Sequence, residues 1–438
     1  MKTAEHRPGA DHCPGAEHRP GAAPRTGSPE PVDPARWPDV AAPPAASRAR
    51  TAVTAAVVRR ALERLPLHVR FADGTVLGKG GPILDVHDPR AFHGRIGSQG
   101  LVGFGEAYMA GEWDAPDLVA ALTVLAANMA ELIPRPLQRL RRLWALRQPH
   151  AQRNTPDGSR TNISHHYDLS NDLFALFLDD TLSYSSALFR GFPADGDLLA
   201  AAQHRKIDRL LDLADVREGT RVLEIGTGWG ELAIRAAARG AHVTSLTLST
   251  EQRDLARERI AAAGLSDRVS VELCDYREAR GTYDAVVSVE MIEAVGAEFW
   301  PVYFRTLDAR LAPGGRCALQ AITMPHERML ATRGSFTWIH KYVFPGGLVP
   351  SVEAVAETVR DHTGLSVERR DAYGAHYAET LRLWRERFTQ RAHDVAALGF
   401  DETFRRMWTF YLAYSEAGFR SGYLDVQQYL LTKEGPAR

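Results

Sequence analysis

Residues 221–234 read RVLEIGTGWGELAI, which is a strand that runs into a glycine-spaced turn and then into a helix. After this stretch the chain continues through the strand-like segments HVTSLTLS, VSVELCD, YDAVVSVE and RCALQAIT, with amphipathic helices between the first of them. This alternation predicts a doubly wound α/β sheet whose strands are mostly parallel. In such sheets ligands bind at the carboxyl ends of the strands, which is where the glycine turn lies.

The glycine spacing of the turn narrows the choice of ligand. It reads Gly226-x-Gly228-x-Gly230 and differs from the G-x-G-x-x-G of dinucleotide-binding folds. A dinucleotide site also uses an acid at the end of the second strand, and that strand ends SLTLST without one. An acid in the first strand, here Glu224, followed by G-x-G-x-G is typical of S-adenosylmethionine enzymes. The glycines let the backbone approach the methionine part of this cofactor, and the acid can meet its ammonium group.

Two further segments fit a cofactor that contains adenosine. In LCDYRE, Asp275 and Tyr276 end the third strand, where the acid can accept a hydrogen bond from the adenine amine and the ring can stack. In LTLSTEQ, Ser249 and Gln252 have the spacing of a capping box for the next helix. The capping role is compatible with ligand binding, because such caps lie at the ligand face of the sheet.

The composition excludes several other classes of protein. The 438 residues include 53 Lys and Arg against 54 Asp and Glu, so a net charge of −1 gives no general attraction to nucleic acid. The three cysteines lack the spacing of metal ligands or of a disulfide framework, which indicates a reducing compartment. No secretory signal is recognisable, and the apolar run from Leu118 is shorter than the roughly 20 residues of a spanning helix. We expect a cytoplasmic or peripheral protein without a metal site.

Composition also divides the chain into four parts. Residues 1–50 contain the imperfect repeat EHRPGA, DHCPGA, EHRPGA and a Pro/Ala-rich stretch, which predict a disordered tail. Residues 51–130 predict a small α+β domain of a lipid-binding kind, and residues 164–438 hold the catalytic α/β pattern. In the linker, 131–163, arginines from Arg135 to Arg153 alternate with Leu and Trp. The linker is either a solvated helix or a basic amphipathic helix on an anionic membrane surface.

A longer stretch upstream of the glycine turn points to a family. SHHYDLSNDLFALFLDDTLSYSSALF, residues 164–189, resembles the segment that opens the catalytic domain of the cyclopropane-fatty-acid synthase family. The resemblance continues through VLEIGTGWG, LTLSTEQ, SVEMIEAVG, YVFPGGLVPS and YLAYSEAGFRSGYLDVQQY and covers about residues 100 to 430. It implies a class I S-adenosylmethionine methyltransferase fold. The implied reaction transfers a methyl or methylene group to the double bond of an unsaturated fatty acyl chain of a phospholipid.

The resemblance assigns cofactor residues beyond the turn itself. Carried over by motif, they are Tyr184 and Ser185 in LSYSSA and Thr247 and Gln252 in LTLSTEQ. We expect them to surround S-adenosylmethionine together with the glycine turn. His165 and His166 are expected to line the lid over the cofactor.

The resemblance also implies a bound bicarbonate ion as the base of the reaction. Its ligands carry over to Glu293 in SVEMIEAVG, Tyr377 in GAHYAETL and the backbone of Ile322. Two positions depart from the family pattern, because Ser186 stands where the family often has a cysteine and Gln320 where it often has a histidine. Both side chains can still donate hydrogen bonds to an anion.

The product depends on how the carbocation formed by methyl transfer loses a proton. Loss from the new methyl closes a cyclopropane, and a hydride shift followed by proton loss leaves a methylene branch, which a separate reductase could convert to a methyl branch. The combination of Ser186, Gln320 and Ala294 resembles the branch of the family that makes 10-methylene or 10-methyl chains. We therefore expect a methylene or methyl-branched product. The alternatives are a cyclopropane synthase, a small-molecule N- or O-methyltransferase, and a non-catalytic lipid-binding protein.

Overall fold

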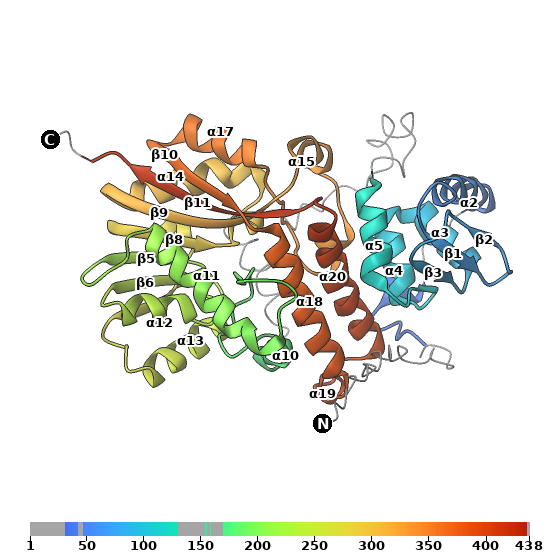
Figure 1. Cartoon of the computed structure of the whole chain (residues 1–438), viewed down its shortest axis with the longest axis horizontal. Coiled ribbons are helices and arrows are strands. Elements are labelled where there is room, and N and C mark those ends of the chain that lie inside the picture. The colour runs from blue at the N-terminus through green and yellow to red at the C-terminus, as the bar shows by residue number, and fades with distance from the viewer. Residues whose placement is uncertain (1–30, 43–46, 130–153, 156–157, 159–169, 436–438) are drawn as a thin grey trace, which may run out of the picture. The chain divides into compact units, whose positions relative to one another are not determined.

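A seven-stranded sheet organises the carboxyl-terminal part of the chain in the computed structural model, which describes residues 31–42, 47–129, 154–155, 158 and 170–435. Its strands are β5 (Arg221–Ile225), β6 (His242–Thr247), β7 (Val269–Leu273), β8 (Tyr283–Val289), β9 (Leu311–Thr323), β10 (Leu365–Ala372) and β11 (Asp425–Lys433). Their order is β10-β11-β9-β8-β5-β6-β7 (Figure 1). Strands β9, β8, β5, β6 and β7 are parallel, and the prediction of a mostly parallel, doubly wound sheet is confirmed.

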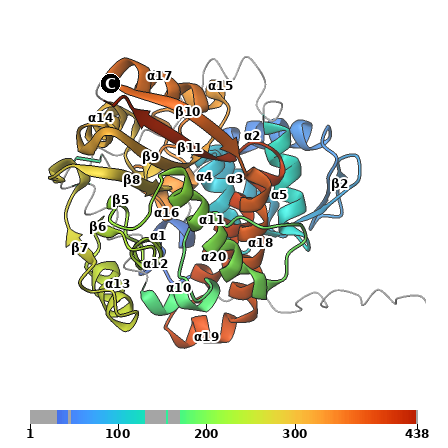
Figure 2. The same cartoon turned by 60° about the vertical axis from the view of Figure 1, so that its left-hand side comes forward.

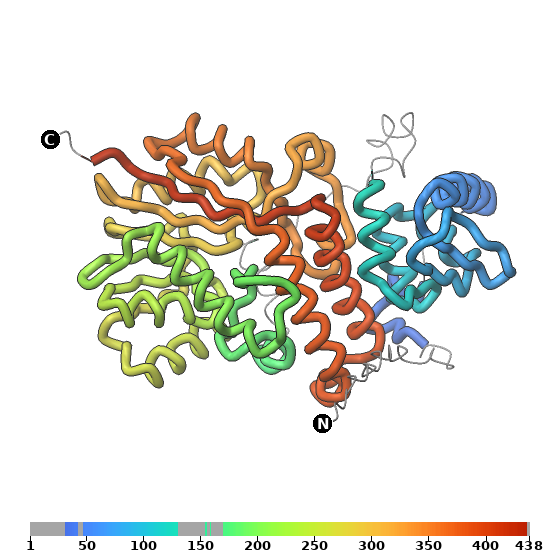
Figure 3. Tube along the Cα trace, viewed as in Figure 1, coloured from blue at the N-terminus to red at the C-terminus, as the bar shows by residue number. Residues whose placement is uncertain are grey.

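The last strand of the chain departs from the parallel pattern. β11 lies between β9 and β10 and is antiparallel to both, as the red carboxyl-terminal segment in Figure 3 shows. Antiparallel strands do not require the crossover connection that parallel strands need, and the segment between β10 and β11, residues 374–420, is nevertheless mostly helical.

Helices cover both faces of this sheet (Figures 1 and 2). On one face lie α11 (Leu199–Leu213) and α12 (Glu231–Ala238), and on the other lie α14 (Trp300–Arg310) and α17 (Val352–His362). Successive residues of a strand point to opposite faces. Accordingly Val222 packs with Ile207 and Leu232, whereas the next residue, Leu223, packs with Phe304 and Val355. The alternation buries strand β5 on both sides.

The remaining helices of this part surround the carboxyl ends of the strands or flank the sheet. They are α10 (Asn171–Phe177), α13 (Thr250–Ala262), α15 (His326–Thr332), α16 (Trp338–Tyr342), α18 (Gly374–Gln390), α19 (Ala392–Ala397) and α20 (Glu402–Arg420). Four short 3₁₀ turns bear on the site or its approaches. η2 (Gly196–Leu198) precedes α11, and η3 (Tyr276–Glu278), η4 (Ile292–Ala294) and η5 (Ala297–Phe299) follow β7 and β8. Helices α18 and α20 lie side by side (Figures 1 and 2).

The amino-terminal part has a small sheet of its own. Its four strands are β1 (His68–Phe71), β2 (Val76–Leu77), β3 (Ile83–Val86) and β4 (Trp113–Asp114), in the order β2-β1-β3-β4. The helices are α1 (Pro38–Ala41), α2 (Arg48–Leu62), α3 (Pro89–Gln99), α4 (Leu101–Met109) and α5 (Leu118–Ala127). β1 and β2 pair antiparallel around a turn in which Asp73 accepts from the backbone N–H of Thr75. Gly74 adopts a φ of 84° in that turn, which glycine accommodates without strain.

The expected disorder of residues 1–50 is wrong for the part of this tail that the structure describes. Pro38–Ala41 form helix α1, where Val40 is only 1% exposed. The indole Nε1 of Trp37 donates to Asp401 at 2.8 Å, so one large aromatic ring anchors a stretch that is otherwise rich in Pro and Ala. Residues 1–30 lie outside the described residues.

Helices α16 and α20 contact the amino-terminal part of residues 31–438. The guanidinium of Arg406 lies 4.1 Å from the ring centroid of Tyr108 and donates to the carbonyl oxygens of Tyr108 and Trp113. Nearby, the buried carboxylate of Glu106 accepts from Lys341 at 2.5 Å and from Tyr342 at 2.8 Å. These contacts join α4 to α16 and α20.

Several sequence expectations fall on residues that the structure leaves undescribed. The basic segment from Arg135 to Arg153 and the pair His165 and His166 lie outside the described residues. The domain boundaries at residues 130 and 163 therefore stay a prediction. Within the described part, none of the helices is long and apolar enough to cross a membrane.

Candidate active site

The glycine turn joins β5 to α12 at the carboxyl end of the strand. Gly226, Gly228 and Gly230 have φ values of 100°, 52° and 89°, a region that residues with a Cβ rarely adopt. A Cβ at Gly228 would protrude into open space, with no other group within 4 Å, and one at Gly226 would meet only the side chain of Met291. The turn is thus a bare backbone cradle that an added side chain would fill. This geometry fits the close approach that was predicted for S-adenosylmethionine.

Glu224, in strand β5, lies just below this turn and is buried. Its carboxylate accepts from the hydroxyl of Ser245 at 2.5 Å, and the same hydroxyl contacts Thr227 at 2.7 Å. Burial raises the pKa of Glu224 to about 8, although the Ser245 hydrogen bond and the charge of Lys206 oppose the rise. The expected contact of Glu224 with the cofactor ammonium stays a prediction.

A buried lysine that sequence reasoning missed, Lys206, helps to hold the segment 184–186. The ammonium of Lys206, on α11, donates to Ser185 at 2.6 Å, and Gln203 donates to the carbonyl of Ser185 at 2.9 Å. Burial lowers the pKa of Lys206 to about 8, against the charges of Glu290, Asp179 and Glu224. The preceding residue, Tyr184, places its hydroxyl 2.7 Å from that of Tyr411 on α20. The segment 184–186 is therefore held from two helices.

The residues assigned to the adenosine side follow β6 and β7. The hydroxyl of Thr247 donates to the side-chain oxygen of Gln252 at 3.0 Å, and Ser249 accepts from the backbone N–H of Gln252 at 3.2 Å. Ser249 therefore caps α13 as expected. The Gln252 side chain turns toward Thr247, so only one half of the predicted capping box forms. The cap fixes both residues at the ligand edge of the sheet.

Asp275 and Tyr276 are buried after β7 in a set of contacts within the protein. The carboxylate of Asp275 forms a bidentate ion pair with Arg277, at 2.6 and 2.8 Å. The ring of Tyr276 packs edge-on against Tyr303, with ring centroids 5.4 Å apart. The expected contacts of these two residues with adenine stay predictions, and Arg277 belongs to their surroundings.

Three of the residues assigned to the bicarbonate ion converge on one carboxylate, that of Glu290. Its Oε1 accepts from the backbone N–H of Ser186 at 2.9 Å and from the amide of Gln320 at 2.8 Å. Its Oε2 accepts from the hydroxyl of Tyr377 at 2.7 Å. Gln428 donates to the amide oxygen of Gln320 at 2.8 Å, which keeps the nitrogen of that amide toward Glu290. Sequence reasoning missed Glu290, although it is the first acid of the motif SVEMIEAVG, three residues before Glu293.

The backbone of Glu290 is strained. This residue follows β8 with a φ of 50°, in the left-handed region that costs a side-chain-bearing residue about 1–2 kcal/mol. Its N–H donates to the carbonyl of Gln320 at 2.8 Å, so main chain and side chain are both tied to the same residue of β9. Strain of this kind is found where a functional geometry is over-determined by its surroundings.

The other two assigned residues, Glu293 and Ile322, bond to each other. The backbone N–H of Ile322 donates to Oε1 of Glu293, and Oε2 of Glu293 is buried with no hydrogen-bond partner within the described residues. Burial and the neighbouring charge of Glu290 raise the pKa of Glu293 to about 8. A proton is therefore held at this carboxyl near neutral pH.

These contacts decide whether the residues present fit a bound bicarbonate. The assigned residues already direct donors at protein carboxylates: the Gln320 amide, the Tyr377 hydroxyl and the backbone N–H of Ser186 bond to Glu290, and the backbone N–H of Ile322 bonds to Glu293. The Ser186 hydroxyl donates to the carbonyl oxygen of Ala187 at 3.2 Å. An added anion would meet two acids and would have to displace one of them. The side chains in this arrangement do not fit the ion.

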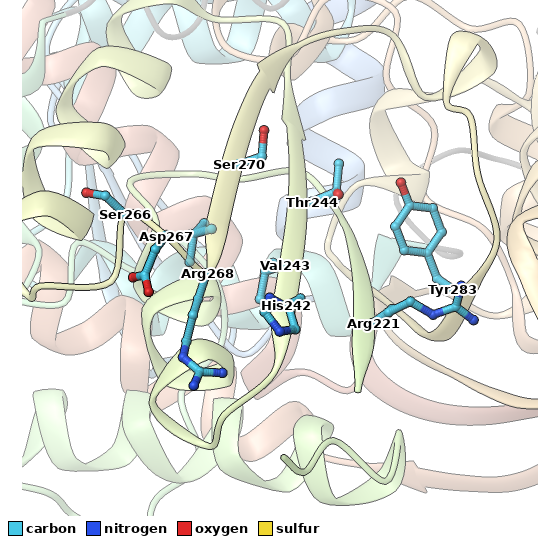
Figure 4. A pocket seen from close by; sticks show the side chains of 10 residues that line it. Arg221, His242, Val243, Thr244, Ser266, Asp267, Arg268, Ser270 and Tyr283 are labelled. Carbon is cyan, nitrogen blue, oxygen red and sulfur yellow. The ribbon is translucent and has the colours of Figure 1, made fainter. Parts of the chain in front are cut away.

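A surface hollow of about 340 Å³ lies away from these residues (Figure 4). It is lined by Arg221, His242, Val269 and Tyr283, among others, which begin strands β5 to β8. The hollow is therefore at the amino ends of the strands, opposite the edge that carries the glycine turn and Glu290. None of the assigned site residues lines it.

Comparisons with known proteins agree with the geometry. A family model described as mycolic acid cyclopropane synthetase matches residues 154–429. The chain is 56% identical to the tuberculostearic acid methyltransferase UfaA1 of Mycobacterium tuberculosis, over 92% of this chain and 97% of that one. It is 33% identical to the cyclopropane-fatty-acyl-phospholipid synthase of Escherichia coli, over 78% and 86% of the two chains.

A solved structure gives the same result for the fold. The mycolic acid cyclopropane synthase CmaA1, complexed with SAH and CTAB, superposes with a TM-score of 0.58 and 30% identity, over 65% of this chain and 99% of that one. SAH is the demethylated form of S-adenosylmethionine, the cofactor that the glycine turn predicts. The chain therefore belongs to the mycolic acid cyclopropane synthetase family of S-adenosylmethionine-dependent methyltransferases.

Proposed function

We propose that this enzyme methylates the double bond of an unsaturated fatty acyl chain of a phospholipid and leaves a methylene branch. The observation that carries the proposal is the 56% identity, over almost the whole chain, to a relative named a tuberculostearic acid methyltransferase. The arrangement of the site supports it, because the glycine turn, the segment 184–186 and the Glu290 cluster meet at the carboxyl ends of adjacent strands.

The chain's own residues account for three requirements of this reaction. S-adenosylmethionine supplies an electron-poor methyl group when it is bound. The glycine turn, Thr247 and Gln252 would hold it, and the buried aromatic rings of α10, α18 and α20 around Tyr184 keep water from the reacting carbons. Glu290 and Glu293 provide carboxyl groups that can hold the departing proton. Bicarbonate, which the family resemblance implies, is left out of the proposal because its donors are already paired with these acids.

The phospholipid substrate implies work at a membrane surface. We include in the proposal a peripheral association with anionic lipid through the basic segment from Arg135 to Arg153, supported by the sequence pattern alone. Conversion of a methylene branch to a methyl branch adds two hydrogen atoms, so it requires a separate reductase with its own electron donor.

Lipid analysis of a host rich in oleate tests the proposal. Cells that express the enzyme should accumulate a C19 acyl chain that gas chromatography and mass spectrometry detect as its methyl ester. A methylene branch is cleaved by ozone to a ketone and is reduced by mild hydrogenation. A product of the same mass that resists both treatments would be a cyclopropane and would make this enzyme a cyclopropane synthase. A resistant product that is two hydrogen atoms heavier would be the methyl-branched chain, reduced by the host. The absence of any new lipid would reject both activities.

A further inference from the structure

The Glu290 carboxylate is held by two side chains that the family resemblance assigns to a bound ion, Gln320 and Tyr377, and by the backbone N–H of a third assigned residue, Ser186. We infer that Glu290 takes the place of bicarbonate, so that a side chain of the enzyme accepts the proton that the acyl chain loses after methylation. This inference rests on the function proposed above. It holds for either product, because the carbocation loses one proton whether it forms the cyclopropane or the methylene branch.

The hydrogen bonds of Glu290 leave room for that proton. A carboxylate has about four acceptor positions. Ser186 and Gln320 occupy two of them on Oε1, and Tyr377 occupies one on Oε2. One position on Oε2 is left without a donor from the described part of the chain. The three donors stabilise the ionised form, which a base must have at the start of the reaction, while burial raises its pKa and makes it a better proton acceptor.

The surroundings fix Glu290 in this place. Its backbone is held by the carbonyl of Gln320, and the Gln320 amide is itself oriented by Gln428. The φ of 50° is unfavourable for a residue with a side chain, so the surrounding structure holds the backbone of Glu290 against its local preference. A base built into the protein is present at every turnover, whereas a dissolved ion has to be bound first.

The proton transfer balances without any further reactant. After methylation the acyl chain carries one positive charge. For the methylene product, a hydride moves from the methylated carbon to the neighbouring cationic carbon, and the positive charge moves to the methylated carbon. A C–H bond of the new methyl then breaks, and its electron pair forms the C=C double bond of the methylene branch. The proton goes to Oε2 of Glu290, which becomes a neutral acid and later releases the proton to solvent.

The first test compares the removal of bicarbonate from the buffer with the removal of the Glu290 carboxylate by mutation. Purified full-length enzyme is assayed with S-adenosylmethionine and vesicles of dioleoyl phosphatidylglycerol, in buffer freed of carbon dioxide and again with added bicarbonate. Wild-type turnover should be the same in both buffers. Glu290→Gln should lose about 100-fold or more of the turnover, and Glu272→Gln, which changes an exposed glutamate of β7, should lose none.

A second variant separates chemistry from folding. Glu290→Gly removes the carboxylate, leaves its three donors without an acceptor and suits the positive φ. Added bicarbonate or formate should restore its turnover, and titration with ¹³C-labelled bicarbonate should give a bound NMR signal with this variant and none with wild type. Affinity for SAH, measured by calorimetry, should stay at the wild-type value in both Glu290 variants.

Specific results would overturn the inference. Wild-type turnover that requires bicarbonate would do so, as would full activity of Glu290→Gln, or a Glu290→Gly enzyme that binds SAH and responds to neither anion. In these cases wild type still makes a methylated lipid and the proposed function stands. Wild type that makes no such lipid in either buffer would overturn the proposed function and this inference with it.

Discussion

Three buried charged residues near the carboxyl edge of the sheet have pKa values shifted from their ordinary values. Burial raises the pKa values of Glu224 and Glu293 to about 8 and lowers that of Lys206 to about 8. Near neutral pH the two glutamates are therefore mostly protonated and uncharged, whereas Lys206 keeps most of its positive charge. Uncharged carboxyl groups suit a reaction whose intermediate is a carbocation, because fewer nucleophiles compete with the base.

Gly228→Ala tests the backbone cradle at the level of one residue. Both Gly228 (φ 52°) and Gly264 (φ 70°) have positive φ and nothing within 4 Å of an added Cβ. Alanine at either position should cost about 1–2 kcal/mol of stability. Only Gly228→Ala should lower the affinity for SAH, by about tenfold or more, which corresponds to about 1.4 kcal/mol. Calorimetry that finds equal SAH affinity in the two variants would contradict a cofactor role for the turn.

Glu293→Gln tests the buried proton. Burial and Glu290 raise the pKa of Glu293 from 4.5 to about 8. Between these values the folded protein keeps a proton that the unfolded chain releases, so this group destabilises the fold increasingly as the pH rises. The glutamine variant cannot titrate. Its melting temperature should match that of wild type near about pH 5 and exceed it near about pH 8, by about 2–4 °C for each kcal/mol. A difference that does not change with pH would argue against the raised pKa.

At the scale of elements, the sequence predicted the local helices, strands and caps. It did not predict which distant segments would come together at the site. The strand, turn and helix of residues 221–238 follow from glycine spacing and apolar periodicity, which are local properties, and so does the Ser249 cap. Glu290 could not be placed in this way. Its partners Ser186, Gln320 and Tyr377 come from three distant segments, and only the assembled sheet brings them together.

The anchored segment before residue 42 was missed for a related reason. Its composition is typical of a disordered tail, but one aromatic side chain reaches Asp401 across most of the length of the chain. Composition describes the average of a segment, and a single half-buried ring with one hydrogen bond is enough to hold a short piece of it in place.

Ser249→Ala tests the cap of α13. Ser249 and Ser47 each accept from the backbone N–H three residues on, at 3.2 Å, and so cap α13 and α2 in the same way. Alanine at either cap should lower stability by about 1 kcal/mol, measured by denaturant unfolding. Ser249→Ala should in addition weaken SAH binding, because the cap positions Thr247 and Gln252. If Ser47→Ala weakened SAH binding as much, the effect would be one of general stability.

At the scale of the whole molecule, the proposed phospholipid substrate requires the enzyme to reach acyl chains that are packed in a bilayer. The proposed route is adsorption through the basic segment from Arg135 to Arg153. Adsorption of this kind is electrostatic and weakens as salt screens the charges.

Arg141→Gln/Arg142→Gln tests this route by vesicle sedimentation. Each basic residue near an anionic surface is worth about 1 kcal/mol, so the double variant should bind phosphatidylglycerol vesicles about 30-fold more weakly. Arg360→Gln/Arg369→Gln removes two exposed arginines elsewhere on the catalytic part and should bind like wild type. Binding of wild type that is indifferent to lipid charge and to ionic strength would reject the surface interaction.

The Arg406 stack on Tyr108 and the Glu106–Lys341 pair also bear on how hybrid enzymes of this family can be assembled. A chimera that joins residues 31–129 of this chain to the catalytic part of a relative would keep Tyr108 and Glu106 but inherit foreign side chains at positions 406 and 341. Arg95, within residues 31–129, would still lie 3.9 Å from Glu106, but the closer partner Lys341 would be lost. Removing one partner of a buried ion pair costs about 3–5 kcal/mol in measured cases. A chimera with its crossover near residue 130 should therefore be stable only when Arg406 and Lys341 are transplanted together with residues 31–129.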